Sequence, residues 1–286
     1  MTKTTPNPEL DLNLLARQWG ARKIPFTDKD WLSADPLDQA LRQLDHSAAL
    51  RSVLLIIGPN GVGKSALVSH WADQLDRRRF EPLILTQATL SGSSILAALT
   101  AKLGKNARCR RETNLALIEE ALAELEHTIP VIILDEAQQY SCGALEEIRL
   151  LLGLNLCSPP AFALVLIGDD YFLGTLKLRH HRALYSRIAF RVALSTWSSV
   201  QSETFVRRSL SSAGIEREVL EPAAMELLVS SAGGIARSLV SLARNAWIAA
   251  ASGQQTTLTT EHVQTAIRQM PCVPGLQRPS QPSDSL

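Results

Sequence analysis

A glycine-rich segment at residues 58–65 has the residue types and spacing of a phosphate-binding loop. It reads Gly58-Pro59-Asn60-Gly61-Val62-Gly63-Lys64-Ser65, which fits G-x-x-x-x-G-K-S/T. Glycines let the backbone curl so that its amides point inward at phosphate oxygens. Lys64 would neutralise the β- and γ-phosphates, and the Ser65 hydroxyl would bind Mg²⁺. The segment predicts a nucleotide site formed by the loop and Ala66, which follows it.

Two acidic residues follow an apolar run about 70 residues later. Asp135 and Glu136 come directly after Val131–Leu134. A buried strand places such carboxylates at the edge of an open α/β sheet where ligands bind. We expect Asp135 to bind Mg²⁺, through water, and Glu136 to polarise the attacking water as general base. The chain has no N-K-x-D motif of the guanine-binding type, which favours ATP over GTP.

Short apolar runs alternate with helical patterns up to about residue 195. Each run is bounded by turn residues, as expected for strands that are buried on both faces of a parallel sheet. The predicted strands are Val53–Ile57, Pro82–Leu85, Val131–Leu134, Ala163–Ile167 and Val192–Leu194. The predicted helices between them are Ser65–Leu75, Ile95–Leu103, Leu115–Glu126 and Leu145–Leu152. This alternation predicts an α/β domain over residues 10–195.

After residue 196 the pattern becomes helical throughout. Ser198 and Gln201 have the spacing of a capping box, and Pro222 suits the first position of a second helix. A third helix is predicted over Ile235–Ala251, with Gly253 just past its end, and a fourth over Thr260–Met270. We therefore expect a helical domain at 196–270, with disordered tails at 1–9 and 271–286.

The composition excludes several classes of protein. The chain has 286 residues, of which 45% are hydrophobic, and its 29 basic residues balance 28 acidic ones, so any nucleic-acid site must be a local patch. Its four cysteines form no C-x-x-C pair, which argues against a zinc site and favours a reducing compartment. The apolar runs are too short to span a membrane, and the N-terminus lacks a signal-peptide core. We expect a cytoplasmic protein without a membrane partner.

Several segments resemble the AAA+ ATPases, and within them the ATPases like general secretion pathway protein A and the TniB and TnsC helper subunits of bacterial transposons. The resemblance covers about residues 15–270. It is carried by Pro25-Phe26, Asp135-Glu136-Ala137-Gln138, the helix Leu145–Leu151, Gly168 and Gly233-Gly234-Ile235-Ala236-Arg237. It implies a P-loop AAA+ parallel sheet flanked by helices, followed by a small all-helical lid.

The resemblance also implies roles for two arginines. Arg237 matches the second-sensor arginine, which reaches from the lid to the nucleotide. Arg187 matches the arginine finger that enters the neighbouring subunit's site, with Arg182 as the competing candidate. The first-sensor position departs from the family, because Asp169 and Asp170 follow the fourth strand where a polar uncharged residue is usual. Acids near the γ-phosphate would repel it, which predicts slow hydrolysis.

A basic segment at residues 102–111 is the candidate surface for DNA. It contains five basic residues and no acid: Lys102, Lys105, Arg108, Arg110 and Arg111. Such a loop suits contacts to the phosphate backbone without sequence readout. The alternative is a solvated loop whose charges are compensated by acids nearby in space.

Two other features receive structural rather than functional interpretations. His180-His181 has no metal-binding companion at a useful spacing, so we expect a polar loop. Trp19 and Trp31 precede the phosphate loop, and we expect them to pack on the α/β domain or to form a subunit contact.

Three functions remain open at this point. The first is a transposition helper that oligomerises on double-stranded DNA with ATP and Mg²⁺ and recruits a transposase. The end of the chain soon after the lid favours it, because secretion-type relatives continue into a membrane span. The second is an ATPase that assists a secretion or pilus machine through protein partners. The third is an ATP-gated scaffold with little hydrolysis.

Overall fold

The computed structural model describes residues 11–27, 35–86, 91–125, 127–153 and 160–270. The chain divides into two compact units. One is Ser33–Ser195, and the other combines Met1–Leu32 with Thr196–Leu286. Both predicted tails lie outside the described residues.

The first unit is built on a five-stranded parallel sheet with the order β2-β3-β4-β1-β5. Its strands are β1 (Val53–Ile57), β2 (Phe80–Leu85), β3 (Ile129–Leu134), β4 (Ala163–Gly168) and β5 (Ile188–Ala193). Every residue of β1 and β4 is buried, because these strands lie inside the sheet and are covered on both faces. The predicted parallel α/β fold is confirmed.

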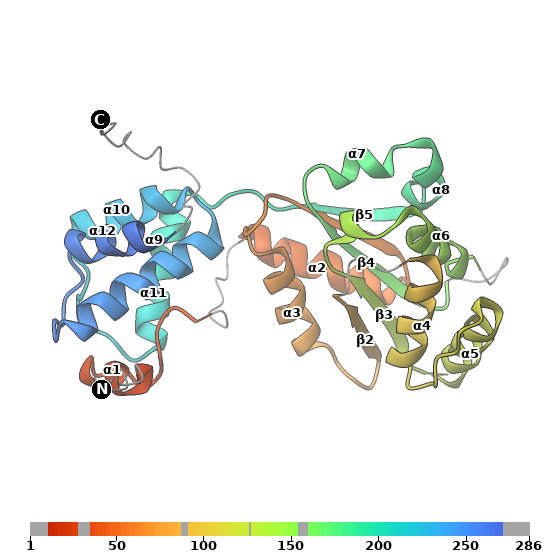
Figure 1. Ribbon diagram of the computed structural model, residues 1–286, viewed down its shortest axis with the longest axis horizontal. Helices are drawn as coiled ribbons and strands as arrows, with labels where there is room; N and C mark the ends of the chain where they lie inside the picture. The colour runs from red at the N-terminus through yellow and green to blue at the C-terminus, as the bar shows by residue number, and fades with distance from the viewer. Residues whose placement is uncertain (1–10, 28–34, 87–90, 126, 154–159, 271–286) are drawn as a thin grey trace, which may run out of the picture. The chain divides into compact units, whose positions relative to one another are not determined.

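Helices cover both faces of this sheet (Figure 1). On one face lie α2 (Asp35–Ala49) and α3 (Lys64–Gln74), and on the other lie α4 (Gly92–Lys102) and α6 (Cys142–Leu151), with α5 (Arg111–Glu124) packed on α4. Alternate strand residues such as Leu55, Ile132 and Leu164 join the core on the α4 and α6 side. The unit also contains the short helices η1 (Ala137–Gln139), α7 (Phe172–Leu176), η2 (Arg179–His181) and α8 (Arg182–Tyr185).

Strand β5 begins at Ile188, four residues before its predicted start at Val192. It lies at the edge of the sheet, so its residues alternate between more and less exposed positions. The prediction relied on continuous apolar runs, which mark strands that are buried on both faces. An edge strand shows alternation instead, and Arg191 interrupts this one.

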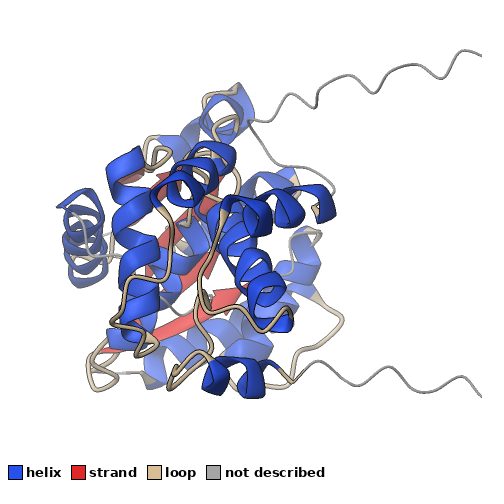
Figure 2. Ribbon diagram, turned by 90° about the vertical axis from the view of Figure 1, so that its left-hand side faces the viewer, coloured by secondary structure: helices blue, strands red, loops and turns tan. Residues whose placement is uncertain are grey.

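The second unit consists of helices, loops and one isolated β-bridge within the described residues, and the five strands of the sheet belong to the first unit. Helices predominate on the side of the molecule that faces the viewer in Figure 2. Its C-terminal helices are α9 (Ser199–Ser212), α10 (Pro222–Ala232), α11 (Ala236–Ser252) and α12 (Thr260–Gln269). The predicted capping box is present, since Ser198 Oγ accepts from the Gln201 amide and Gln201 accepts from the Ser198 amide. Pro222 begins α10 and Gly253 follows α11, as predicted. In the described ranges, we find no helix long and apolar enough to cross a bilayer.

The described N-terminal residues group with these helices rather than with the sheet, which differs from the predicted α/β domain over 10–195. Helix α1 (Leu12–Gln18) leads into Trp19, whose ring packs edge-on against Trp247 with a centroid separation of 6.4 Å. The Phe26 amide donates to Ser209 Oγ at 2.8 Å, and Arg244 donates to the Phe26 carbonyl. Burial of Trp19 against α11 therefore corrects its expected place on the α/β domain. Trp31 lies outside the described residues.

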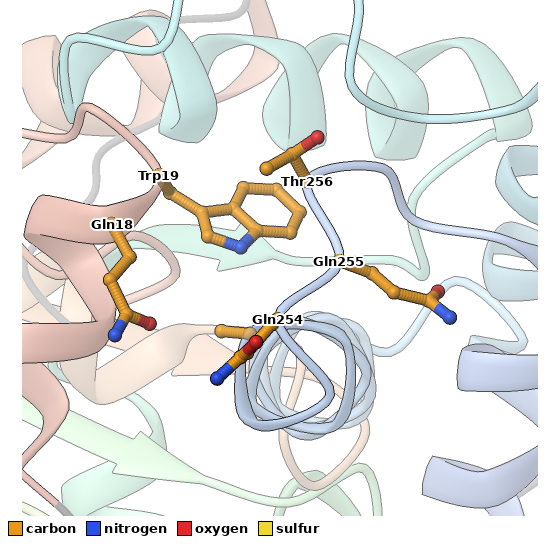
Figure 3. Close-up of a pocket in the computed structure, with 6 residues that line it drawn as sticks. Gln18, Trp19, Gln254, Gln255 and Thr256 are labelled. Carbon is orange, nitrogen blue, oxygen red and sulfur yellow. The ribbon is translucent and has the colours of Figure 1, made fainter.

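A cavity of about 270 Å³ adjoins Trp19 in this unit (Figure 3). Its lining residues are Gln18, Trp19, Ala251, Gln254, Gln255 and Thr256. They come from the end of α1 and from the end of α11 with the turn that follows it.

Candidate nucleotide-binding site

The predicted phosphate loop connects β1 to α3, the placement that its function requires. Gly61 and Gly63 have φ values of +81° and +108°, which side chains other than glycine rarely adopt. A Cβ at Gly58 would overlap the Leu194 carbonyl oxygen, so only glycine fits there. Between these glycines, Pro59 is partly buried, Asn60 is exposed and Val62 is buried. The glycines in the motif thus meet local backbone requirements of the loop.

Lys64 is buried at the first position of α3 and lies inside the loop. Its ammonium donates to the carbonyl of Gly58 at 2.7 Å and to that of Pro59 at 3.0 Å. Burial lowers the pKa of Lys64, and four nearby carboxylates oppose this shift, those of Glu136, Asp170, Asp169 and Asp135. The Lys64 ammonium therefore lies inside the loop, where phosphate oxygens would replace these two carbonyl groups as its acceptors.

Ser65 and Asp135 meet across the site although they are 70 residues apart. Ser65 Oγ donates to Asp135 Oδ1 at 3.1 Å, and the same carboxylate oxygen accepts from the Glu136 amide at 2.9 Å. A hydroxyl and a carboxylate oxygen are the hard ligands that Mg²⁺ prefers. This donor set fits the predicted metal site, in which Mg²⁺ would neutralise phosphate charge. Ala66 is exposed in the first turn of α3.

Glu136 follows β3 in a left-handed conformation, with φ +51°, that few non-glycine residues adopt. Its Oε2 accepts from Gln138 Nε2 at 2.7 Å. The strained turn and this hydrogen bond together fix where the carboxylate lies. Gln138 is the last residue of the Asp135-Glu136-Ala137-Gln138 motif, and the sequence alone assigns no role to it. A polar side chain two residues after a candidate base is the signal that could have identified it.

Replacing Gln138 with alanine is expected to lower kcat for ATP hydrolysis by about tenfold, because one hydrogen bond to a charged group is lost. ATP affinity should stay unchanged, since the hydrogen bond of Gln138 goes to Glu136, the expected base, and not to a group expected to bind phosphate. Steady-state kinetics separate kcat from KM, and the exposed neighbour Gln139 supplies the control Gln139→Ala. A rise in kcat would show that the hydrogen bond restrains Glu136 rather than orients it.

Tyr140 and Asp135 share a hydrogen-bond acceptor at the end of β2. Its hydroxyl donates to the Leu85 carbonyl at 3.0 Å, and the Asp135 amide donates to the same carbonyl at 3.1 Å. Burial, with a smaller contribution from Asp135, raises the pKa of Tyr140 to about 12. The tyrosine therefore stays a neutral donor that joins the end of β2 to the turn after β3.

Asp169 and Asp170 lie near enough to the phosphate loop for both carboxylates to interact electrostatically with the Lys64 ammonium and to raise its pKa. Asp169 Oδ1 accepts from the Phe172 amide at 2.9 Å and so supports the turn into α7. A Cβ at Gly168 would lie 2.6 Å from the Phe172 ring, so this turn also requires glycine. Asp169 thus has a structural role, while Asp170 is exposed.

The three candidate arginines are exposed. Arg187 precedes β5, and its guanidinium group lies next to Gly153, which follows α6. A Cβ added at Gly153 would be 3.3 Å from one of the guanidinium nitrogens. Arg182 begins α8. Arg237 lies in the first turn of α11, in the unit that does not carry the phosphate loop, so its role as a sensor stays a prediction.

The basic segment begins at the last residue of α4 and ends at the first residue of α5. Two of its cations are paired within the unit: Lys105 contacts Glu120 and Glu124 at 3.3 and 2.7 Å, and Arg111 makes two hydrogen bonds to Glu147 at 2.7 and 2.8 Å. The side chains of Lys102, Arg108 and Arg110 are exposed and form no ion pair with any described residue. We call these three residues the exposed basic triad.

The backbone at one member of the triad is held in place. The buried Asn114 accepts from the Arg108 amide and donates to the Arg108 carbonyl, both at 2.8 Å. The loop therefore presents Arg108 from a defined backbone position.

Part of the chain is similar in sequence to known proteins. Residues 48–176 match the family model described as an AAA domain, a range that contains the phosphate loop, Asp135 and Glu136. General secretion pathway protein A from Aeromonas hydrophila is 33% identical over 120 residues. That alignment covers 42% of this chain and 22% of the relative, so the chain spans about a fifth of that protein.

Solved structures show the same fold over most of the chain. The Aeropyrum pernix ORC1 protein in complex with DNA matches with a TM-score of 0.69 at 20% identity, over 84% of this chain and 66% of that one. Drosophila ORC bound to DNA matches with a TM-score of 0.65 at 19% identity, over 93% of this chain and 68% of that one. The strand order, the phosphate loop and these matches together show that the chain has the fold of the P-loop AAA+ ATPases.

Proposed function

We propose that this chain hydrolyses ATP with Mg²⁺ and uses ATP binding to assemble with copies of itself on double-stranded DNA, where the assembly recruits or activates a transposase. The observation that carries the ATPase activity is the contact of Ser65 Oγ with Asp135 Oδ1 at 3.1 Å, with Glu136 next to it. Two oxygen ligands for Mg²⁺, a cation for the phosphates and a carboxylate base are thereby gathered at one edge of the sheet.

Two observations support DNA as the surface for assembly. The exposed basic triad offers three cations that described acids leave uncompensated, and phosphate contacts of this kind need no sequence readout. Two proteins that share the fold are described as bound to DNA. The transposase partner rests on the resemblance of the motifs to the TniB and TnsC group.

The experiment that tests this function is ATP turnover by the purified full chain with and without duplex DNA of mixed sequence. DNA-stimulated turnover that needs Mg²⁺ supports the proposal. Turnover that ignores DNA would contradict the DNA part while leaving the ATPase site intact.

Replacing Lys102, Arg108 and Arg110 together with glutamine is expected to weaken DNA binding and to flatten its dependence on salt. Each phosphate contact that is lost should lower the slope of log K against log salt by about 0.9. Binding titrations at several salt concentrations measure both quantities. The control is Lys105→Gln, because Glu120 and Glu124 already compensate that charge. Equal DNA affinities for the triple variant and the wild type would show that the exposed basic triad does not bind DNA.

A second candidate is an ATPase that assists a secretion or pilus machine through protein partners. The specific observation in its favour is the 33% identity to general secretion pathway protein A. In this function the ATP-dependent assembly would form without DNA. A third candidate, an ATP-held scaffold with little hydrolysis, is favoured by the two carboxylates near Lys64, those of Asp169 and Asp170.

A further inference from the structure

Three potential metal ligands from two separate parts of the sequence lie close together in the first unit. Cys142 begins α6, and His180 and His181 lie in η2. One ligand atom from each side chain lies within 4.8 Å of the other two. The sequence suggested a polar loop for the two histidines because no companion was visible at a useful spacing. The companion is Cys142, which is 38 residues before His180 and is brought there by the packing of α6 against η2.

We propose that Cys142, His180 and His181 form a binding site for a divalent transition-metal ion of the zinc type. Thiolate sulfur and imidazole nitrogen are the ligands that Zn²⁺ prefers, and three protein ligands leave its fourth position open. Tetrahedral Zn²⁺ with bonds of about 2.0–2.3 Å needs ligand atoms about 3.3–3.6 Å apart. Cys142 and His180 are exposed, so side-chain rotation can close the remaining distance.

The positions of these side chains suit metal binding. Cys142 occupies the first turn of α6, and its exposed thiol forms no disulfide with any described residue. His181 is buried, with its ring 4.3 Å from that of His180 between centroids.

The carboxylate nearest to the site belongs to an ion pair. Glu146, one turn after Cys142 on α6, interacts electrostatically with His181. Its two carboxylate oxygens accept hydrogen bonds from Arg149 at 2.7 and 2.8 Å. Arg149 compensates this carboxylate, so the three ligands themselves carry the proposed site. A bound ion would link the start of α6 to the segment that precedes Arg182 and Arg187. This proposal does not depend on the proposed function.

The test is titration of the untagged, reduced full chain with Zn²⁺ by calorimetry and with Co²⁺ by absorption spectroscopy. We expect one ion per chain with micromolar or tighter affinity, and a thiolate-to-cobalt charge-transfer band. Cys142→Ser and His180→Ala should each weaken binding by at least about tenfold, and Cys142→Ser should remove the band. Both positions are exposed, so these variants should fold, and thermal melts check that they do.

The matched controls are Cys109→Ser and His127→Ala, which remove an exposed thiol and an exposed imidazole elsewhere. Neither should change the affinity or the band. Absence of micromolar binding by the wild type would overturn the proposal. So would binding that survives Cys142→Ser, or binding that needs Cys142 but not His180, because the three side chains would then not form one site.

Discussion

Replacing Lys64 with alanine is expected to weaken ATP binding by about a hundredfold or more, the largest loss that any single change in this chain should cause. Charge-assisted hydrogen bonds to phosphate are worth about 1.5–3 kcal/mol, and 1.4 kcal/mol corresponds to a factor of ten. Lys64 is buried in the loop with its ammonium 2.7 Å from the Gly58 carbonyl oxygen, so no other described lysine can take its place. Equilibrium titration with a fluorescent ATP analogue and Mg²⁺ measures the affinity.

The control for this variant is Lys177→Ala, which removes an exposed lysine of the same unit. Thermal melts separate lost binding from lost structure, since Lys64 also holds the carbonyls of the loop. Tight ATP binding by a folded Lys64→Ala variant would show that residues 58–65 do not bind the nucleotide phosphates.

Replacing Glu136 with glutamine is expected to lower ATP turnover by about a hundredfold or more while leaving ATP binding intact. General bases contribute roughly 10²–10⁴-fold to rates, and glutamine keeps the size of the side chain without its basicity. The Asp135 carboxylate and the Ser65 hydroxyl stay in place, so the ligands expected to bind Mg²⁺ are unchanged. Release of phosphate measures turnover, and ATP titration measures binding on the same preparation.

A trapped assembly is the second expected result of this change. If hydrolysis disassembles the oligomer, Glu136→Gln should remain assembled with ATP for longer than the wild type. Glu119→Gln, at an exposed position on α5, is the matched control. Undiminished turnover by Glu136→Gln would assign the base to another residue.

The central strands and the phosphate loop could be predicted because their signals are local. Val53–Ile57 is a continuous apolar run that matches β1 residue for residue, and the glycines of the loop follow from its backbone conformation. Asp135 could be predicted because an acid after a buried strand must emerge at the carboxyl edge of the sheet. The capping box at Ser198 is likewise contained in four consecutive residues.

Other features depend on contacts between distant segments, which one sequence does not reveal. Trp19 lies against Trp247, 228 residues further along the chain, and nothing in its neighbourhood distinguishes this partner from the α/β domain. Lys105 and Arg111 have the same local pattern as the exposed basic triad, yet acids of α5 and α6 pair with them. The approach of Cys142 to the two histidines requires the packing of α6 against η2.

The measurement that tests the central claim most directly is sedimentation of the purified full chain with duplex DNA, with and without ATP and Mg²⁺. We expect large complexes on DNA of any sequence only when both ATP and Mg²⁺ are present, with the Glu136→Gln variant giving the longest-lived ones. Oligomers that form with ATP but ignore DNA would contradict the proposed assembly on DNA, and the exposed basic triad would then be an ordinary solvated surface.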